Sequence, residues 1–172
     1  MSEKLKAAVR DVPDFPIKGI LFKDITPILQ DPQLFHLAVD TLADRHKGNN
    51  LKAAIGIDAR GFIFAGAVAY KLGIGFIPVR KKGKLPWKTV AASYTLEYGS
   101  ETTEMHIDAL AKGDQVIIVD DLLATGGTAM AAATLVNKLG GKIVEIDFLI
   151  ELAFLKGRDR LKDYPVFSAI AY

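Results

Sequence analysis

Hydrophobic and polar positions divide the chain into two kinds of alternating segment. Four short segments are apolar almost throughout, which is typical of strands buried on both faces of a sheet; they are Ala53–Ile57, Gly75–Val79, Val116–Asp120 and Val144–Ile150. Three longer segments have helical patterns, and they span Pro32–His46, Gly61–Leu72 and Gly127–Leu139. This alternation predicts an α/β domain with a central, mostly parallel sheet flanked by helices.

Two regions depart from the alternation. Residues 1–34, which include FPIKGILFKDITPIL, are expected to form an irregular hood laid over the sheet. Residues 81–107 begin with a basic loop, KKGKLPWKT, and continue with two alternating stretches that predict an antiparallel hairpin turning at Gly99-Ser100. An excursion of this length between two core strands is more typical of a flexible functional lid than of a passive connection.

Composition narrows the class of protein. The 172 residues suit one domain spanning 1–172, and a net charge of +2 is too small to indicate a nucleic-acid partner. The chain has no cysteine, which excludes a disulfide scaffold and fits a reducing, cytoplasmic compartment. The longest apolar run, Gly61–Tyr70, is shorter than the roughly 20 residues of a membrane span, so we expect no membrane partner.

The stretch VIIVDDLLATGGTAM, residues 116–130, combines a strand, two aspartates, a turn and a helix start. Ligands of parallel sheets bind beyond the carboxyl ends of the strands, where Asp120 and Asp121 are expected. The first N–H groups of the next helix lack partners and carry the positive end of its dipole. Because Gly126 and Gly127 allow the backbone to approach a ligand closely, we predict a cradle for one phosphate.

The aspartates and the turn suit different parts of one ligand. Thr125 and Thr128 add hydroxyl donors for a phosphate. Carboxylates instead accept hydrogen bonds from vicinal hydroxyls and bind Mg²⁺ directly or through water. A sugar phosphate therefore meets both needs, although a pair of aspartates can also simply end a strand and cap a turn.

The same stretch resembles the phosphoribosyl pyrophosphate (PRPP) signature of the type I phosphoribosyltransferases. The resemblance implies the fold of that family. It implies that Asp120 and Asp121 hold the ribose hydroxyls and take part in catalysis, while Ala124 to Thr128 hold the 5′-phosphate. It also implies that Mg²⁺ is held mainly by PRPP and waters, close to the two aspartates.

A PRPP enzyme needs cations for its leaving group, because negative charge develops on the departing pyrophosphate. Candidates follow two other strands, in GIDARGF and VRKKGKLP; they are Arg60, Arg80, Lys81 and Lys84. Arginine is unfavourable at a helix start unless an anion is present, which favours a binding role for Arg60. A surface position for Arg60 and a solvated loop for the other cations are the alternatives.

The predicted hairpin carries a further candidate group in SYTLEYG, residues 93–99. Closing over PRPP, it would exclude water from a cation-like intermediate. Glu97 would then handle a proton on the purine ring, and Tyr98 would contact pyrophosphate. A solvent-exposed carboxylate at the rim of the hairpin is the alternative for Glu97.

From about Phe15 to Tyr172, the motifs resemble in order and spacing the members of this family that act on adenine. The resemblance implies that a cytoplasmic homodimer converts adenine and PRPP to AMP and pyrophosphate, with Mg²⁺, in purine salvage. Adenine offers an amino donor and a ring acceptor, which backbone carbonyl and N–H groups can match. The resemblance assigns those groups to Leu21 and Lys23, with Phe22 stacking on the base and Leu122 beside it.

Two other functions remain open at this stage. One is transfer to a 6-oxopurine, although such enzymes usually have a lysine near the place of Glu151. The other is a non-enzymatic PRPP-binding regulator, which usually adds a DNA-binding segment for which the sequence has no room. The three histidines, His36, His46 and His106, have no ligand spacing and are interpreted as surface or structural residues.

Overall fold

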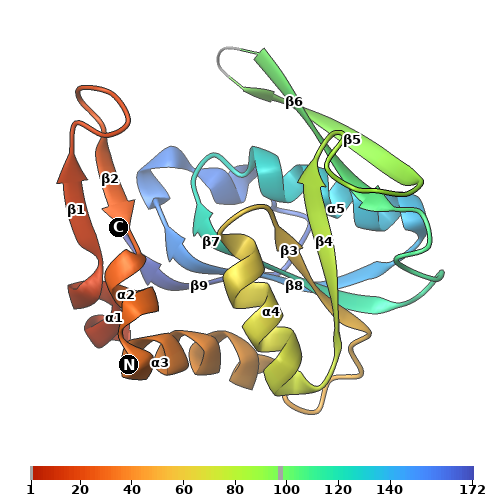
Figure 1. Ribbon diagram of the computed structural model, residues 1–172, viewed down its shortest axis with the longest axis horizontal. Helices are drawn as coiled ribbons and strands as arrows, with labels where there is room; N and C mark the ends of the chain where they lie inside the picture. The colour runs from red at the N-terminus through yellow and green to blue at the C-terminus, as the bar shows by residue number, and fades with distance from the viewer. Residues whose placement is uncertain (1, 97–98) are drawn as a thin grey trace.

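The computed structural model describes residues 2–96 and 99–172 (Figure 1). Its main strands are β3 (Ala53–Ile57), β4 (Gly75–Lys81), β5 (Thr89–Leu96), β6 (Gly99–His106), β7 (Gln115–Leu123), β8 (Lys142–Glu151) and β9 (Val166–Ala171). They form one seven-stranded sheet in the order β5-β6-β4-β3-β7-β8-β9. The strands from β4 to β9 in this order are parallel, whereas β6 and β5 extend the sheet antiparallel at one edge.

Helices cover both faces of the sheet, which confirms the predicted α/β class (Figure 1). They are α1 (Ser2–Ala8), α2 (Thr26–Gln30), α3 (Pro32–Ala43), α4 (Gly61–Leu72) and α5 (Gly127–Leu139). Along β7, Val116 and Ile118 pack in the cluster that contains α5. Ile117 and Val119 pack in the cluster that contains the other four helices. The alternation explains why this strand is apolar at every position.

The helix ends follow the local sequence. The Asp31 side chain accepts hydrogen bonds from the N–H groups of Gln33 and Leu34 and so caps α3. Left-handed Gly73 and Gly140 end α4 and α5, as predicted for α5. The helical pattern predicted to reach His46 is divided, because a 3₁₀ turn, η1 (Asp44–His46), continues from α3.

Two predicted boundaries were wrong in the strands that carry the candidate site. The ladder between β7 and β8 continues to Leu123, so Asp120 and Asp121 lie within the last residues of β7 rather than ending it. The predicted turn at Gly99-Ser100 is also misplaced, because these residues pair with Leu96 and Thr95 within the hairpin ladder. In both cases backbone pairing continues past the residues that usually mark a boundary.

The N-terminal region is more regular than predicted. It contains α1, α2 and a two-stranded antiparallel sheet of β1 (Arg10–Pro13) and β2 (Leu21–Asp24), which stands beside the main sheet (Figure 1). Leu5 of α1 and Ile28 of α2 are fully buried. The C-terminal Tyr172 lies against this region, since the Nζ atoms of Lys6 and Lys23 lie 4.9 and 4.0 Å from its ring centroid.

The remaining segments complete the core. Strand β9 was not predicted, and two 3₁₀ turns, η2 (Ala153–Leu155) and η3 (Gly157–Arg160), precede it. In the hairpin, Ala92 of β5 and Met105 of β6 are buried in the α5-side cluster, so the base of the hairpin belongs to the core. Within residues 2–96 and 99–172, no helix has the length and apolar character needed to cross a membrane.

Candidate active site

The carboxyl ends of β3, β4 and β7 bring together side chains from three separate stretches of sequence. Arg60, just after β3, has its Nε 3.0 Å from Oδ2 of Asp121 on β7. Arg80, near the end of β4, has its Nε 2.8 Å from Oδ2 of Asp58. This edge therefore gathers both predicted acidic and cationic groups, as expected for neighbouring parallel strands.

The turn that is predicted to hold a phosphate lines a cavity of about 80 Å³ between β7 and α5. Its walls are formed by Asp120, Leu122, Leu123, Ala124, Thr125, Gly126, Gly127, Thr128, Ala129 and Phe148. Gly126 occupies the N-cap position of α5 with φ of 78°, a left-handed conformation that favours glycine. The free N–H groups at the start of α5 thus lie in the same cavity wall as the threonine hydroxyls.

The two aspartates are held in a strongly desolvated setting. Asp120 Oδ1 accepts a hydrogen bond from the backbone N–H of Asp121, at 2.9 Å. Burial, and next the charge of Asp121, raise the pKa of Asp120 well above its ordinary value. Burial also raises the pKa of Asp121, while the nearby Arg60 guanidinium opposes that rise. The ionised forms of the two carboxyl groups are therefore unfavourable here, and hydroxyl donors or cations bound beside them would stabilise these forms.

Gly61 explains how Asp120 reaches its position. A Cβ atom at residue 61 would lie 2.5 Å from Asp120 Oδ1 and 3.3 Å from the backbone oxygen of Val119. The first residue of α4 must therefore lack a side chain for β7 and its carboxylate to pack against it. The GIDARGF stretch consequently supplies the Arg60 cation and also the glycine that lets α4 pack closely against β7.

Two of the other predicted cations, Arg80 and Lys81, are already engaged with neighbouring groups. Arg80 Nη1 donates to the backbone oxygen of Lys84 at 3.2 Å, which ties the loop after β4 to the strand end. Lys81 Nζ donates to Glu101 Oε1 at 2.8 Å. Both cations would have to exchange these partners to reach a ligand, but exposed ion pairs of this kind cost little to break.

Sequence reasoning missed a tyrosine that joins the hairpin to the cradle. Tyr94 donates a hydrogen bond to Glu101 Oε2 at 2.7 Å and accepts one from Thr128 Oγ1 at 3.3 Å. Its ring also lies against Gly127, where a Cβ atom would be 3.2 Å from Tyr94 Cδ2. The observed register pairs Tyr94 with Glu101, and the turn predicted at Gly99-Ser100 concealed this contact because it implies a different register.

The predicted base-binding residues lie on β2 and β7. The Arg60 guanidinium carbon is 5.4 Å from the centroid of the Phe22 ring, so Arg60 lies near Phe22 on β2 as well as Asp121 on β7. The Lys23 ammonium is directed instead to Asp11, at 2.6 Å. Leu122 lines the cradle cavity.

Glu97 and Tyr98, predicted in the lid, lie outside the described residues.

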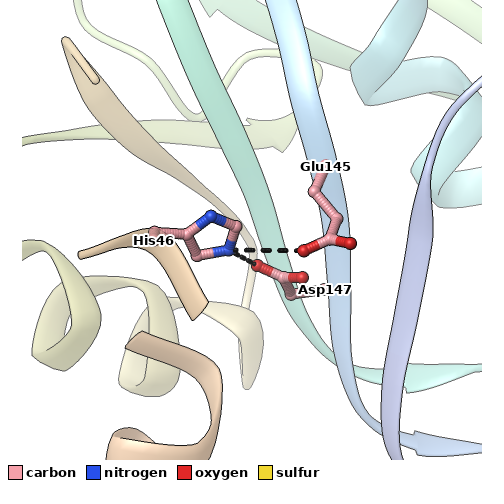
Figure 2. Close-up of side chains that lie close together, drawn as sticks. All are labelled: His46, Glu145 and Asp147. Carbon is pink, nitrogen blue, oxygen red and sulfur yellow. Dashed lines mark hydrogen bonds and ion pairs between the residues drawn. The ribbon is translucent and has the colours of Figure 1, made fainter. Parts of the chain in front are cut away.

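A second polar cluster joins η1, which follows α3, to β8, and the sequence did not reveal it (Figure 2). His46 Nε2 is 2.6 Å from Asp147 Oδ2 and 3.7 Å from Glu145 Oε2. Within the described residues, these three form the only group of three or more potential ligands of a metal ion. However, Arg45 already occupies Glu145 with contacts of 2.8 to 3.1 Å. His46 is buried, in agreement with the structural role predicted for it.

Comparisons with known proteins agree on one family. Residues 25–170 match the family described as phosphoribosyl transferase domain. The chain is 55% identical to the adenine phosphoribosyltransferase of Roseiflexus sp. (strain RS-1), over the full length of both proteins. The crystal structure of adenine phosphoribosyltransferase from Thermoanaerobacter pseudethanolicus superposes with a TM-score of 0.96 at 49% identity and covers 100% of both proteins. The Saccharomyces cerevisiae enzyme, complexed with an imino-altritol bisphosphate and adenine, gives a TM-score of 0.93 at 43% identity, covering 98% of this protein and 97% of that enzyme.

Proposed function

The chain belongs to the phosphoribosyltransferase family, and from this premise we infer that it transfers the 5-phosphoribosyl group of PRPP to adenine, forming AMP and pyrophosphate. The observation that carries this function is the single cavity shared by Asp120 and the turn from Ala124 to Thr128. One wall offers a carboxylate for ribose hydroxyls, and the other offers N–H and hydroxyl donors for a phosphate. A sugar 5-phosphate is complementary to both.

In the ribose subsite, the vicinal hydroxyls of PRPP would donate hydrogen bonds to Asp120 and Asp121. The raised pKa values of both carboxyl groups support this assignment, because hydroxyl donors stabilise the ionised form that burial disfavours. Holding the ribose in this way fixes C1 relative to the incoming base. Positioning of this kind supplies much of the acceleration in a transfer between two bound substrates.

The pyrophosphate subsite is assigned to cations at the ends of β3 and β4, namely Arg60, Arg80, Lys81 and Lys84, with Tyr98 as a further contact. Arg60 would leave Asp121 and Arg80 would leave Asp58 as the ligand enters. The guanidinium groups would then meet negative charge as it develops on the leaving group. Asp121, released from Arg60, would become available to the ribose.

Mg²⁺ is the cofactor that we assign, and the residues present fit a metal carried in with PRPP. Among the described residues Asp120 and Asp121 belong to no group of three or more potential metal ligands, which is too few for a metal cage built from protein alone. Mg²⁺ usually keeps several waters and binds through one or two carboxylates plus substrate phosphates. Bound there, it would offset charge on the departing pyrophosphate.

Adenine is assigned to the space between β2 and β7. Strand β2 pairs only with β1 in the described structure, so its other edge is not used by a neighbouring strand. The backbone of Leu21 and Lys23 would match the amino group and ring nitrogen of adenine, and Phe22 and Leu122 would contact its faces. A 6-oxopurine reverses both hydrogen-bonding groups and would leave buried polar atoms unpaired. Glu97 is the group assigned to the purine proton.

The assembly that we propose is a cytoplasmic homodimer that acts in purine salvage. Helix α4 exposes Ile63 and Tyr70, which are 40% and 91% accessible, and Phe76 on β4 is 39% accessible. Phe62 packs edge-on against Phe76 with ring centroids 5.4 Å apart, which joins the helix and strand into one apolar surface. Apolar side chains exposed in this way mark a surface for association.

A substrate panel tests the proposed function. The protein would be incubated with Mg²⁺, PRPP and, in separate reactions, adenine, hypoxanthine, guanine or orotate, and the nucleotide product would be identified by chromatography. AMP from the adenine reaction alone is expected. Formation of IMP or GMP at a comparable rate would contradict the assignment of adenine as the substrate. If no base yielded a nucleotide, the proposed transferase activity itself would be refuted.

A further inference from the structure

An arginine outside the signature stretch lies directly beside the phosphate cradle. Arg160 is the last residue of η3. A Cβ atom at Gly127 would lie 3.2 Å from Arg160 Nη1, and one at Gly126 would lie 3.4 Å from Arg160 Cβ. The Arg160 side chain therefore runs along the first residues of α5, with its guanidinium at the amino end of the helix.

Backbone contacts hold this arginine in place. A Cβ atom at Gly126 would lie only 2.5 Å from the carbonyl oxygen of Gly157, and one at Gly157 only 2.3 Å from that of Ala124. The turn and the start of η3 are thus packed backbone to backbone with no room for a side chain. A hydrogen bond of 2.9 Å from Leu152 N–H to Leu123 O joins the residue after β8 to the last residue of β7, just before the turn.

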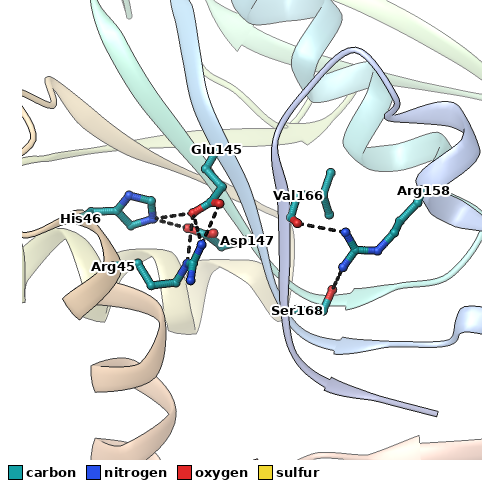
Figure 3. Close-up of polar contacts among 7 residues, drawn as sticks. All are labelled: Arg45, His46, Glu145, Asp147, Arg158, Val166 and Ser168. Atoms are coloured by element: carbon teal, nitrogen blue, oxygen red, sulfur yellow. Dashed lines mark hydrogen bonds and ion pairs between the residues drawn. The ribbon is translucent and has the colours of Figure 1, made fainter.

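A second arginine fixes the far side of η3. Arg158 makes contacts of 2.8 to 3.0 Å with both carboxylate oxygens of Glu151 on β8. It also donates to Val166 O at 2.9 Å and to Ser168 Oγ at 3.3 Å, which connects η3 to β9 (Figure 3). These bonds anchor η3 and so hold the backbone of Arg160 beside the start of α5.

Arg160 is exposed, and its charge has no carboxylate partner among the described residues. Arg60, Arg80 and Arg158 each pair with a carboxylate, whereas Arg160 forms no ion pair with any carboxylate that the structure describes. A cation near the amino end of a helix is unfavourable because the helix dipole is positive there. An anion bound at the cradle would be attracted both by the guanidinium of Arg160 and by the positive end of the helix dipole.

We propose that Arg160 binds the 5′-phosphate of PRPP and of AMP, as a cationic contact in addition to the neutral donors of the turn. The inference rests on the proposed function and deepens its phosphate subsite. The 5′-phosphate is a dianion placed beside two carboxylates, so a guanidinium offsets repulsion that N–H and hydroxyl groups only partly offset. Arg160 thereby favours ligands that carry a 5′-phosphate over those that do not.

The test compares Arg160→Gln and Arg160→Lys with a matched control, Lys162→Gln, which removes an exposed cation two residues further along. Calorimetry would measure AMP binding, and steady-state assays would measure KM for PRPP and for adenine. Arg160→Gln should weaken AMP binding and raise KM for PRPP by about tenfold, the order of one charge-assisted hydrogen bond, with KM for adenine unchanged. Arg160→Lys should recover part of the loss, and Lys162→Gln should resemble the parent protein.

Each remaining outcome is decisive. Unchanged AMP affinity in Arg160→Gln would overturn the role of Arg160 while leaving the transferase function intact, provided that the parent protein makes AMP. An equal loss of adenine affinity, or full loss in Arg160→Lys as well, would indicate that Arg160 only supports the fold of η3. If Arg160→Gln does not fold, the Arg160→Lys result and a weaker affinity of the parent protein for AMP at high salt decide the question. Failure of the parent protein to form AMP would instead overturn the proposed function itself.

Discussion

Gly61 is a single residue on which the geometry of the acidic pair depends. A methyl group at this position would lie 2.5 Å from Asp120 Oδ1, so Gly61→Ala should displace the carboxylate and lower kcat/KM. We expect a destabilisation of about 1–3 kcal/mol, measured by denaturant unfolding. Because Asp120→Ala removes the atoms that collide, the loss of stability should shrink when Gly61→Ala is introduced into that variant. Equal losses in both backgrounds would contradict the contact.

Replacing Asp120 and Asp121 should affect activity and stability in different ways. The double variant Asp120→Asn/Asp121→Asn should lower kcat/KM by about a thousandfold, since charged groups that orient the ribose are lost. Both carboxyl groups have raised pKa values in the folded protein, so their contribution to stability is present at acid pH and is lost as the pH rises through those values.

The double variant should therefore be as stable as the parent protein, or more stable, at pH 7 and should lose this advantage toward pH 4. Thermal unfolding at several pH values, together with the AMP assay, would measure both effects. A variant that keeps normal activity would refute the ribose assignment. A variant that fails to fold would refute the description of the pair as an unfavourable buried charge.

At the scale of elements, a buried pair joins η1 to β8. His46 Nε2 contacts Asp147 Oδ2 at 2.6 Å, and both side chains are buried. His46→Ala should destabilise the protein by about 3–5 kcal/mol, because it leaves a buried carboxylate without a partner. His36→Ala, at a histidine that forms no hydrogen bond in the described structure, is the matched control and should change stability little. Urea unfolding measures both, and a loss below about 1 kcal/mol in His46→Ala would contradict the pair.

The same pair predicts a pH dependence of stability. Burial raises the pKa of Asp147 from 3.8 to about 6, against the opposing effect of His46. The stabilising contribution of protonated Asp147 is complete below pH 3.8 and declines as the pH rises to about 6. Asp147→Asn has no such titration, so the stability of the parent protein relative to this variant should fall between these two pH values. A difference that stays constant, or rises, would contradict the raised pKa.

The elements differ in how far their sequence predicts them. The bounds of β3, α4 and α5 agree with the patterns, because strands buried on both faces and helices ended by glycine have local signals. The ladder that carries β7 past Asp121 to Leu123 depends on pairing with β8, which local sequence does not contain. His46 and Asp147 are 101 residues apart, and Arg160 reaches the cradle only through the packing of η3. Such contacts are decided by tertiary structure, so periodicity could not indicate them.

At the scale of the whole molecule, the apolar surface on α4 and β4 predicts association of two copies of the protein. Tyr70 is 91% exposed in the single copy, and a glutamate there would have to be buried in the dimer. Tyr70→Glu should therefore shift the protein from dimer to monomer in sedimentation experiments. Phe154→Glu, at another aromatic that is 70% exposed, should leave the dimer intact. A parent protein that sediments as a monomer would refute the proposed assembly.

The proposed function requires a single binding site for ribose 5-phosphate between the acidic end of β7 and the start of α5. A crystal structure of the protein with bound AMP tests this claim most directly. We predict that the phosphate occupies the turn from Ala124 to Thr128 and that the ribose hydroxyls contact Asp120 and Asp121. Density for AMP elsewhere on the sheet, with the turn empty, would contradict this binding site.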